Sequence, residues 1–365
     1  MVSGGRRRRG SVFILTVWMV GVLGFFAVSV GVSVRASIDA VRRLELRERL
    51  YRAAEAGIHA MVQEVVQAAR EERPPAFGLA AAGGRQWDML QVSCGAWRRS
   101  ADYLPGGGSE NFWWPGAQDE TAKLNINTAP PETLQRLLVL VGGRDMNSAQ
   151  RLAAAIVDWR DADEQPLTQG AESSYYRRLP VPYACADAPF SAVEELRLVR
   201  DADAAVLNRI QPYITIYGSG AVNLNEAAAP VLAALALGDS LIRKIIRFRC
   251  GPDGLFLTED DRRFSAAAAI VPELSRIEAL TPDEASILSR AVADKIVGVA
   301  SAWFYFDSTA VQPESGAACR ITSVFERRRG AEGNPRMQMK QWRTFFLHEG
   351  NSAARGGAGS LRGEL

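Results

Sequence analysis

The chain has 365 residues, of which 47% are hydrophobic, and its formal net charge at pH 7 is only +2. This length is sufficient for one large domain or two ordinary domains with packed cores. Four of the positive charges are the consecutive arginines at positions 6–9, so the rest of the chain is almost balanced. The charge balance argues against a protein that coats nucleic acid.

Cysteine and histidine are sparse. The residues concerned are Cys94, Cys185, Cys250, Cys319, His59 and His348. No two of the cysteines form a C-x-x-C pair, so the usual spacing of zinc ligands is absent, and structural thiols or long-range disulfides remain open. Two histidines offer little material for histidine-based catalysis or for a histidine-rich metal site. We therefore expect a protein that is not an enzyme.

Residues 11–34 carry no charged side chain, and these 24 positions would span about 36 Å as a helix. A bilayer core is roughly 30 Å thick, so the segment is long enough to cross a membrane. The arginines before the segment indicate a cytoplasmic N-terminus, with the chain after about Arg35 on the other side. A cleaved signal peptide fits less well because its apolar region is shorter. A plain single-pass signal anchor is the remaining alternative for this segment taken alone.

The helical pattern continues beyond the apolar segment. Apolar residues recur at steps of three and four from Val41 to Ala69, until Pro74 and Pro75 interrupt the pattern. The sequence therefore predicts one helix of about 60 residues, roughly 90 Å long.

One internal repeat is present. Residues 124–134 read LNINTAPPETL and residues 222–232 read VNLNEAAAPVL, an offset of 98 positions. Each copy predicts a short strand followed by a helix. The paired asparagines are expected to satisfy backbone groups in the turn. Asn127 or Thr128 in the first copy, and Asn225 in the second, are expected to cap the helix that follows.

The segments after the two copies, together with residues 190–210, resemble helix-hairpin-helix modules, many of which bind DNA. Phosphate capture would require hairpin glycines and nearby basic residues. The candidates are Gly142, Gly143, Gly238, Arg243, Lys244 and Arg247. We favour an interpretation in which the glycines end helices and the basic residues are solvated. DNA binding fits poorly with a region outside the membrane, so we expect no nucleic-acid partner.

Acidic residues gather between the two copies of the repeat. They are Asp158, Asp161, Asp163 and Glu172. Clustered carboxylates suit a hard cation such as calcium, which takes six to eight oxygen ligands. The spacing is not that of an EF-hand, and a merely solvated acidic loop is the alternative. Tyr175 and Tyr176 are interpreted as packing residues that shape this loop.

Alternating patterns near residues 303–306, 319–324 and 337–342 predict antiparallel strands, and an earlier strand is expected near residues 92–98. The sequence thus predicts an α+β fold. A helical region of residues 120–300 would be inserted between parts of its sheet. Residues 350–365 are rich in Gly, Ser and Ala and are expected to be disordered.

Two sets of motifs resemble the K-type minor pseudopilin family of type II secretion systems. The basic leader ends at Gly10 before Ser11, as at a prepilin peptidase cleavage site. The second set is the order D-W-x-D-x-D from residue 158, G-A-E-x-x-Y-Y from residue 170, P-F-x-x-x-E-E-L-x-x-V from residue 189, and then the second N-x-N motif. Most pilin-like proteins carry glutamate at the fifth mature position. This chain has Leu15 there, and K-type members also lack the glutamate.

The resemblance implies a pilin-like fold, in which the long N-terminal helix packs on the antiparallel sheet. Its parts would be a leader at 1–10, a membrane segment at 11–34, pilin-like parts at 35–119 and 301–349, an insert at 120–300 and a tail at 350–365. It implies calcium in the insert, although family members commonly have an acidic residue where this chain has Ser173. The implied role is a tip subunit that starts pseudopilus assembly for protein export, anchored in the inner membrane with its C-terminal domain in the periplasm. Its implied partners are prepilin peptidase and the I-type and J-type minor pseudopilins. The alternative is a membrane-anchored DNA-binding protein of competence type.

Overall fold

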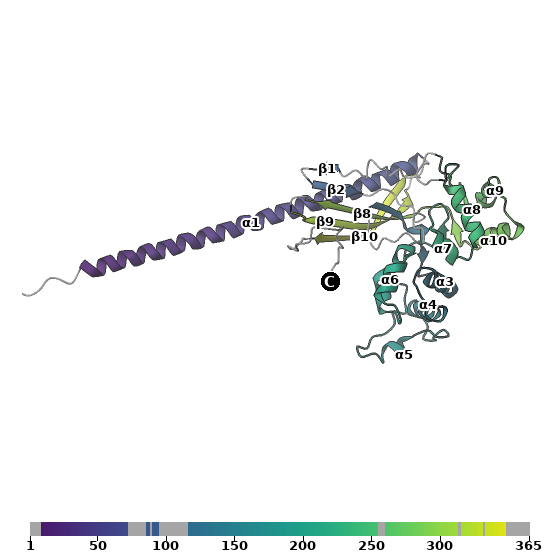
Figure 1. Cartoon of the computed structure of the whole chain (residues 1–365), viewed down its shortest axis with the longest axis horizontal. Coiled ribbons are helices and arrows are strands. Elements are labelled where there is room, and N and C mark those ends of the chain that lie inside the picture. The colour runs from purple at the N-terminus through teal and green to yellow at the C-terminus, as the bar shows by residue number, and fades with distance from the viewer. Residues whose placement is uncertain are drawn as a thin grey trace, which may run out of the picture.

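The computed structural model describes residues 9–71, 85–87, 90–94, 116–254, 260–312, 315–330 and 333–347, with the backbone alone at 9–12, 85–87 and 90–94. Helix α1 runs from Arg9 to Arg70 and extends far beyond the rest of the molecule (Figure 1). Its N-terminal part is long and apolar enough to cross a membrane. The prediction of one continuous helix is confirmed. Its last residue lies just before the prolines, and the expected tail at 350–365 lies outside the described residues.

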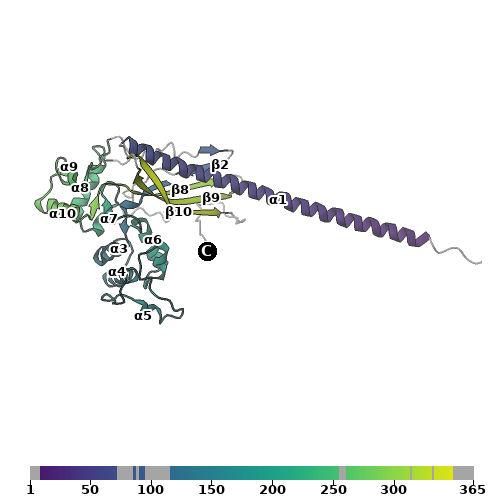
Figure 2. The same ribbon diagram turned by 180° about the vertical axis from the view of Figure 1, so that it is seen from behind.

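An antiparallel sheet packs against the C-terminal half of α1. Its strand order is β1-β2-β8-β9-β10, with β3 also paired to β8. The bounds are β1 Arg85–Trp87, β2 Leu90–Cys94, β3 Gly116–Asp119, β8 Trp303–Val311, β9 Ala318–Arg329 and β10 Pro335–Leu347. The three C-terminal strands are confirmed and are longer than predicted. The strand expected at 92–98 begins at Leu90 and ends at Cys94, and residues 95–98 lie outside the described residues. Figure 2, which views the molecule from behind, shows α1 lying across the sheet.

Apolar side chains join α1 to the sheet. Leu50 and Ile58 of α1 are buried in one cluster with Phe304, Phe306 and Ile321 of the strands. Burying each such side chain contributes about 1.5–3 kcal/mol, which fixes the helix on this face. Among the described side chains of α1, Leu50 is the first that is buried, and Leu46 and Arg47 just before it already contact the cluster and the Phe346 ring of β10. The α+β prediction, a long helix packed on an antiparallel sheet with additional helices, is therefore confirmed.

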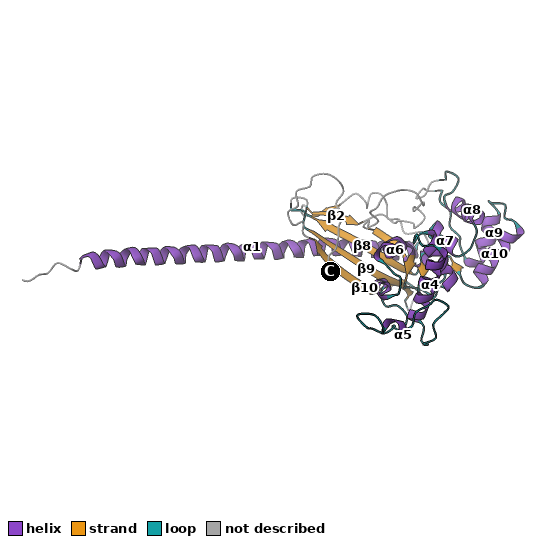
Figure 3. Ribbon diagram, turned by 60° about the horizontal axis from the view of Figure 1, so that its bottom comes forward, coloured by secondary structure: helices purple, strands orange, loops and turns teal. Residues whose placement is uncertain are grey.

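All the shorter helices described lie between β3 and β8 in the sequence, and Figure 3 shows them gathered beyond one end of the sheet. The first group contains α3 Pro131–Leu140, α4 Met146–Arg160, α5 Ser173–Tyr176, the 3-10 helix η3 Val193–Leu198 and α6 Ala204–Ile210. The second group contains α7 Ala229–Ala234, α8 Asp239–Arg249, α9 Ile270–Ser275 and α10 Pro282–Ala293. Each group has its own hydrophobic core. The short 3-10 helices that remain are η2 Glu120–Ala122, η4 Gln211–Tyr213 and η5 Ala267–Ala269.

The two groups repeat one topology. A parallel strand pair closes each group, namely β4 with β5 and β6 with β7. The strand bounds are β4 Leu124–Asn125, β5 Ile214–Thr215, β6 Val222–Asn223 and β7 Val297–Gly298. The strand and helix expected after each N-x-N motif are confirmed. We call residues 124–215 the first half and residues 222–298 the second half.

The asparagines of the repeat do not cap the following helices, so that prediction is wrong. Pro130 and Ala228 occupy the two N-cap positions, and neither makes a side-chain cap. The second asparagine of each motif instead clamps a distant backbone. Asn127 accepts a hydrogen bond from the Phe190 N–H at 2.7 Å and donates to the Phe190 carbonyl at 3.1 Å. Asn225 makes the same pair of bonds to Phe264, at 2.8 and 3.1 Å.

The same equivalence extends to the end of the long helix in each half. Arg160, at the end of α4, donates to the Ala129 carbonyl at 2.7 Å. Arg249, at the end of α8, donates to the Ala227 carbonyl at 2.7 Å. The aromatic residue just before each arginine stacks on the clamped phenylalanine, as Trp159 on Phe190 and Phe248 on Phe264. Each half therefore has one frame made of an asparagine clamp, an arginine and an aromatic stack.

Asp119 connects the sheet to the second half. This buried residue ends β3, and its Oδ2 accepts hydrogen bonds from Asn223 Nδ2 and Ser301 Oγ, both at 2.7 Å. Its Oδ1 accepts from the Thr121 N–H at 2.9 Å. Burial raises the pKa of Asp119 to about 6, although these hydrogen bonds oppose the shift.

Candidate cation site in the first half

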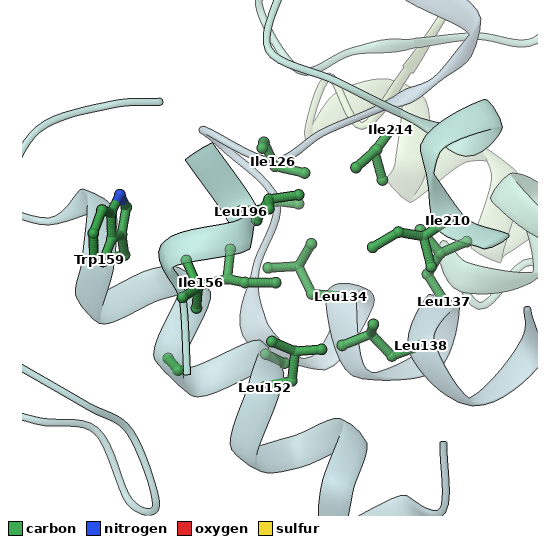
Figure 4. Close-up of a cluster of buried hydrophobic side chains, with 14 of the residues drawn as sticks. Ile126, Leu134, Leu137, Leu138, Leu152, Ile156, Trp159, Leu196, Ile210 and Ile214 are labelled. Carbon is green, nitrogen blue, oxygen red and sulfur yellow. The ribbon is translucent and has the colours of Figure 1, made fainter. Parts of the chain in front are cut away.

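An aromatic cluster supports the acidic loop that follows α4. Trp159 is buried at the edge of the first core, as Figure 4 shows, and contacts the rings of Tyr176, Tyr183 and Phe190. Tyr176 is fully buried, and its hydroxyl accepts a hydrogen bond from the Arg200 N–H at 3.1 Å. The interpretation of the tyrosines as packing residues is confirmed. The cluster fixes both ends of the loop, because Trp159 precedes it and Phe190 follows it.

Three of the four predicted ligands come together in the structure. Asp161, Asp163 and Glu172 each place a carboxylate oxygen within 4.8 Å of the others. Ligands on opposite sides of a calcium ion are about 4.8 Å apart, since each Ca–O distance is about 2.4 Å. Glu172 belongs also to a second group, in which its carboxylate, the Cys185 thiol and the Asp187 carboxylate lie within the same distance.

Glu172 is the most unusual residue of the site. It is only 2% exposed, and neither carboxylate oxygen has a hydrogen-bond partner of ordinary geometry among the described residues. Desolvation, followed by repulsion from Asp158, Asp161 and Asp187, raises the pKa of Glu172 to about 7, although the neighbouring Cys185 thiol opposes the shift. A buried carboxylate without a partner is costly, so this arrangement suits a bound cation.

Asp161 shares this environment. Its pKa is raised, first by desolvation and then by the charges of Asp163 and Asp158, whereas Arg160 lowers it. Its Oδ1 is buried and has no hydrogen-bond partner among the described residues. The loop therefore holds several carboxylates close together with little compensating positive charge. All of these donors are hard oxygens, which calcium and magnesium prefer.

Asp158, the fourth predicted ligand, lies outside both groups. It is fully buried, and its Oδ1 accepts a hydrogen bond from the Leu167 N–H at 3.1 Å, which fastens the middle of the loop to α4. Its Oδ2 lies against Gly170, where an added Cβ would collide with this oxygen. The close approach explains why glycine occupies position 170.

The sequence prediction missed two members of the site. Cys185 and Asp187 lie more than ten residues beyond Glu172, and they join it only through the path of the loop. Asp187 adopts a left-handed backbone with φ of 47°, which is uncommon for a residue other than glycine. Ser173 is not a ligand in this arrangement, because its Oγ accepts a hydrogen bond from the Cys185 N–H at 2.9 Å. The available signal was that Asp187 stands two residues before the P-F-x-x-x-E-E-L-x-x-V motif.

Comparison with known proteins identifies the family. The model of the family described as type II secretion system (T2SS), protein K, matches residues 116–219. The type II secretion system protein K of Pectobacterium carotovorum subsp. carotovorum is 30% identical over 185 residues, which are 49% of this chain and 52% of that protein. The protein K of Dickeya chrysanthemi is 37% identical over 109 residues, which are 28% of this chain and 30% of that protein.

The chain belongs to the type II secretion system protein K family. The match spans about half the length of the Pectobacterium relative and less of the Dickeya relative. A chain in the crystal structure of the GspK-GspI-GspJ complex from enterotoxigenic Escherichia coli has a similar fold, with a TM-score of 0.58. That likeness covers 84% of this chain and 99% of the other, at 16% identity.

The candidate cation site of this protein K family member lies inside the matched segment, since all of its residues fall within 116–219. The predicted cleavage residues Gly10 and Ser11 lie in the first turn of α1, and their side chains are outside the described residues. The side chain of Leu15 is exposed on α1.

Two of the basic residues that were considered for DNA binding form ion pairs with glutamates of this chain. Lys244 Nζ is 2.6 Å from Glu284 Oε2, and Arg247 Nη1 is 3.2 Å from Glu278 Oε2. At the start of α4, the Asp145 carboxylate accepts hydrogen bonds from the Asn147 and Ser148 N–H groups, both at 3.0 Å. These amides, at the glycine hairpin, are the ones that would bind a phosphate.

Proposed function

We propose that this chain is a minor pseudopilin of a type II secretion system, placed at the tip of the pseudopilus, where it helps to start assembly. The family assignment supports the system, and the architecture supports the position. The helical region gathers at the end of the molecule opposite the projecting part of α1, as Figure 1 shows. A bulky region at this end would hinder the stacking of a further subunit above it. In this role the chain acts as a structural subunit.

The exposed apolar surface of α1 supports anchoring in the inner membrane and later packing within a fibre. Residues 13–34 present apolar side chains to the surroundings along the whole segment. In a bilayer or among neighbouring helices this surface is satisfied by apolar contacts. Leu15 at the fifth position after Gly10 places no carboxylate in the membrane. This suits a subunit with no neighbour above it whose N-terminal amine would need a partner.

We propose the I-type and J-type minor pseudopilins as partners, since the solved structure with the similar fold is a GspK-GspI-GspJ complex. The test is to co-express the full chain with these proteins from the same secretion system and to purify it in detergent. We expect the three proteins to copurify at a constant ratio. Recovery of this chain alone, with the other two present and folded, would reject the partner assignment.

Leader removal is tested separately. Co-expression with a prepilin peptidase should give a product that lacks residues 1–10, as measured by intact mass. The control is a chain with Gly10→Leu, which we expect to remain at full mass. An unprocessed wild-type chain beside a processed control pilin would contradict the pseudopilin proposal.

We propose that Asp161, Asp163 and Glu172 hold calcium and thereby fix the loop between α4 and α5. The buried, unpartnered Glu172 is the observation that supports this proposal. Calorimetric titration of the full chain with calcium should show binding, which Asp161→Ala and Asp163→Ala each weaken. Asp294→Asn is a matched control, because Asp294 is an exposed aspartate outside the site. Unchanged binding in both site variants would reject the assignment.

Surface DNA capture is the second candidate, and the pairing of Lys244 with Glu284 disfavours it. Electrostatic DNA binding is strongest at low salt. A gel-shift experiment at low ionic strength should therefore show no complex with the full chain. A salt-dependent complex would support the DNA-binding alternative over the secretion role.

A further inference from the structure

We propose that Glu172, Cys185 and Asp187 form a second cation site, which prefers a thiol-binding divalent metal of the zinc type to calcium. The three ligand atoms lie within 4.8 Å of one another, so a modest side-chain adjustment would let all three contact one ion. Glu172 and Cys185 are buried, whereas Asp187 is exposed, so the group is open to solvent on one side. The proposal shares Glu172 with the calcium site but does not depend on calcium being bound there.

The surroundings of the Glu172 carboxylate supply an independent reason to expect an ion. Both of its oxygens are buried and have no hydrogen-bond partner of ordinary geometry, and no ion pair includes Glu172 among the described residues. Glu172 belongs to two groups of ligands, one with Asp161 and Asp163 and the other with Cys185 and Asp187. One carboxylate can therefore serve one ion in each group.

Cys185 and Asp187 are held in place by their backbone. The Cys185 N–H donates to Ser173 Oγ at 2.9 Å, and the Cys185 sulfur lies 3.6 Å from the Ala171 carbonyl oxygen. These contacts fix the thiol beside the backbone of residues 171–173, and so beside Glu172. The left-handed backbone at Asp187 turns the chain immediately after the cysteine. The site is thus positioned by the same loop that the aromatic cluster anchors.

The sulfur decides which metal is favoured. Thiolate ligands favour zinc and similar borderline or soft ions, whereas calcium requires oxygen ligands. On binding, the thiol S–H bond breaks, a sulfur–metal bond forms and the proton leaves to solvent, with no change in oxidation state. Two carboxylates and one thiolate give three protein ligands, and solvent can complete a tetrahedral zinc site. The first group has no sulfur, so the two groups should differ in metal preference.

The experiment uses the metal-free full chain in detergent, titrated with Co²⁺ as a spectroscopic substitute for zinc. We expect a near-ultraviolet charge-transfer band from a cobalt–thiolate bond. Zinc should abolish this band at one equivalent, and excess calcium should not. Cys185→Ser should remove the band and weaken zinc binding more than about tenfold. Cys250→Ser is the matched control, since Cys250 is also a buried cysteine but belongs to neither group.

Further variants separate this proposal from the calcium proposal. Asp163→Asn should weaken calcium binding and leave the cobalt band unchanged, whereas Asp187→Asn should weaken zinc binding while the thiol remains. A wild-type chain without the band, or a band that persists in Cys185→Ser, overturns the second site whatever the calcium result. Loss of calcium binding alone leaves the second site standing. If Cys185→Ser does not fold, Asp187→Asn supplies the decisive measurement.

Discussion

The two halves of the helical region share one frame, but they differ in the charged partner of a buried glutamate. In the first half, Glu172 is buried without an ion-pair partner among the described residues. In the second half, Glu226 is equally buried, but Arg263 Nη1 lies 2.5 Å from its Oε1. An arginine in the fold satisfies one carboxylate, and the other belongs to the group of carboxylates for which we propose an ion. The two halves therefore share a frame and differ in the charge pairing of a buried glutamate.

The lengths of the loops differ as well. Between the frame arginine and the clamped phenylalanine, the first half contains residues 161–189 and the second half contains residues 250–263. The longer loop includes α5 and both ligand groups. An insertion at this point is tolerated because the frame closes on either side of it, through the aromatic stack and the asparagine clamp.

The aromatic stacks should be equally important to the two halves, and this is the largest expected effect. Trp159→Ala and Phe248→Ala should each reduce the free energy of unfolding by about 3–5 kcal/mol, because each leaves a large cavity in a core. Urea denaturation of the full chain in detergent, followed by circular dichroism, measures the loss. Leu140→Ala, at an exposed position, is the control and should change stability by less than about 0.5 kcal/mol. If one aromatic variant matched the control, the two frames would not be equivalent.

The two asparagine clamps should contribute differently to stability, because one asparagine is more buried than the other. Asn225 is buried, whereas Asn127 is half-buried. Asn225→Ala should cost about 2–3 kcal/mol of unfolding free energy, since it leaves two buried backbone groups without partners, and Asn127→Ala should cost less. The same denaturation assay measures both. Asn208→Ala, on the exposed face of α6, is the matched control. A larger loss at Asn127 than at Asn225 would reverse this ranking and contradict the argument from burial.

The two buried glutamates should respond with opposite signs. With a chelator present, Glu172→Gln should raise the free energy of unfolding by about 1–2 kcal/mol, because it removes a desolvated charge that its neighbours repel. Glu226→Gln should lower it by about 1–3 kcal/mol, because Arg263 loses its partner. In excess calcium the gain at Glu172 should turn into a loss, since bound ligand no longer stabilises the fold. Glu164→Gln, exposed in the same loop, is the control. Equal signs in chelator would contradict the comparison.

The smallest expected effect is on the pH dependence of stability, and it follows from the different partners of the first asparagine in each motif. Asn223 bonds to the Asp119 carboxylate, whereas Asn125 donates to the carbonyls of Tyr217 and Gly218, which do not titrate. Because the pKa of Asp119 is raised to about 6 in the fold, the folded state holds its proton longer than the unfolded state does. Stability should therefore fall as pH rises from about 4 to about 6, by an amount on the order of 1–2 kcal/mol.

Comparing unfolding at several pH values in wild type and Asp119→Asn tests this contribution. The variant should lose the part of the pH dependence that Asp119 causes. The control is Asp294→Asn, which makes the same substitution at an exposed position and should leave the pH dependence unchanged. An identical pH profile in wild type and Asp119→Asn would remove the predicted difference between the two halves.

The sequence by itself determined the features that depend on neighbouring residues. The absence of charge over residues 11–34 and the helical period up to Ala69 required one long helix, and α1 has this form. Each of the two N-x-N motifs predicted a strand followed by a helix, and the structure contains both strand–helix pairs. The alternating C-terminal patterns predicted the sheet. These signals come from local periodicity, which acts over a few residues and can be read directly along the chain.

Tertiary structure alone decided the use of the polar side chains. The asparagines looked like helix caps, but they clamp phenylalanines 63 and 39 residues away. Asp158 stays a predicted ligand whose Oδ1 also accepts a hydrogen bond from the Leu167 N–H, whereas Cys185 and Asp187 join Glu172 from the far end of the same loop. A polar group takes whichever partner the fold brings within about 3 Å, and sequence spacing does not reveal that partner when the intervening loop folds back.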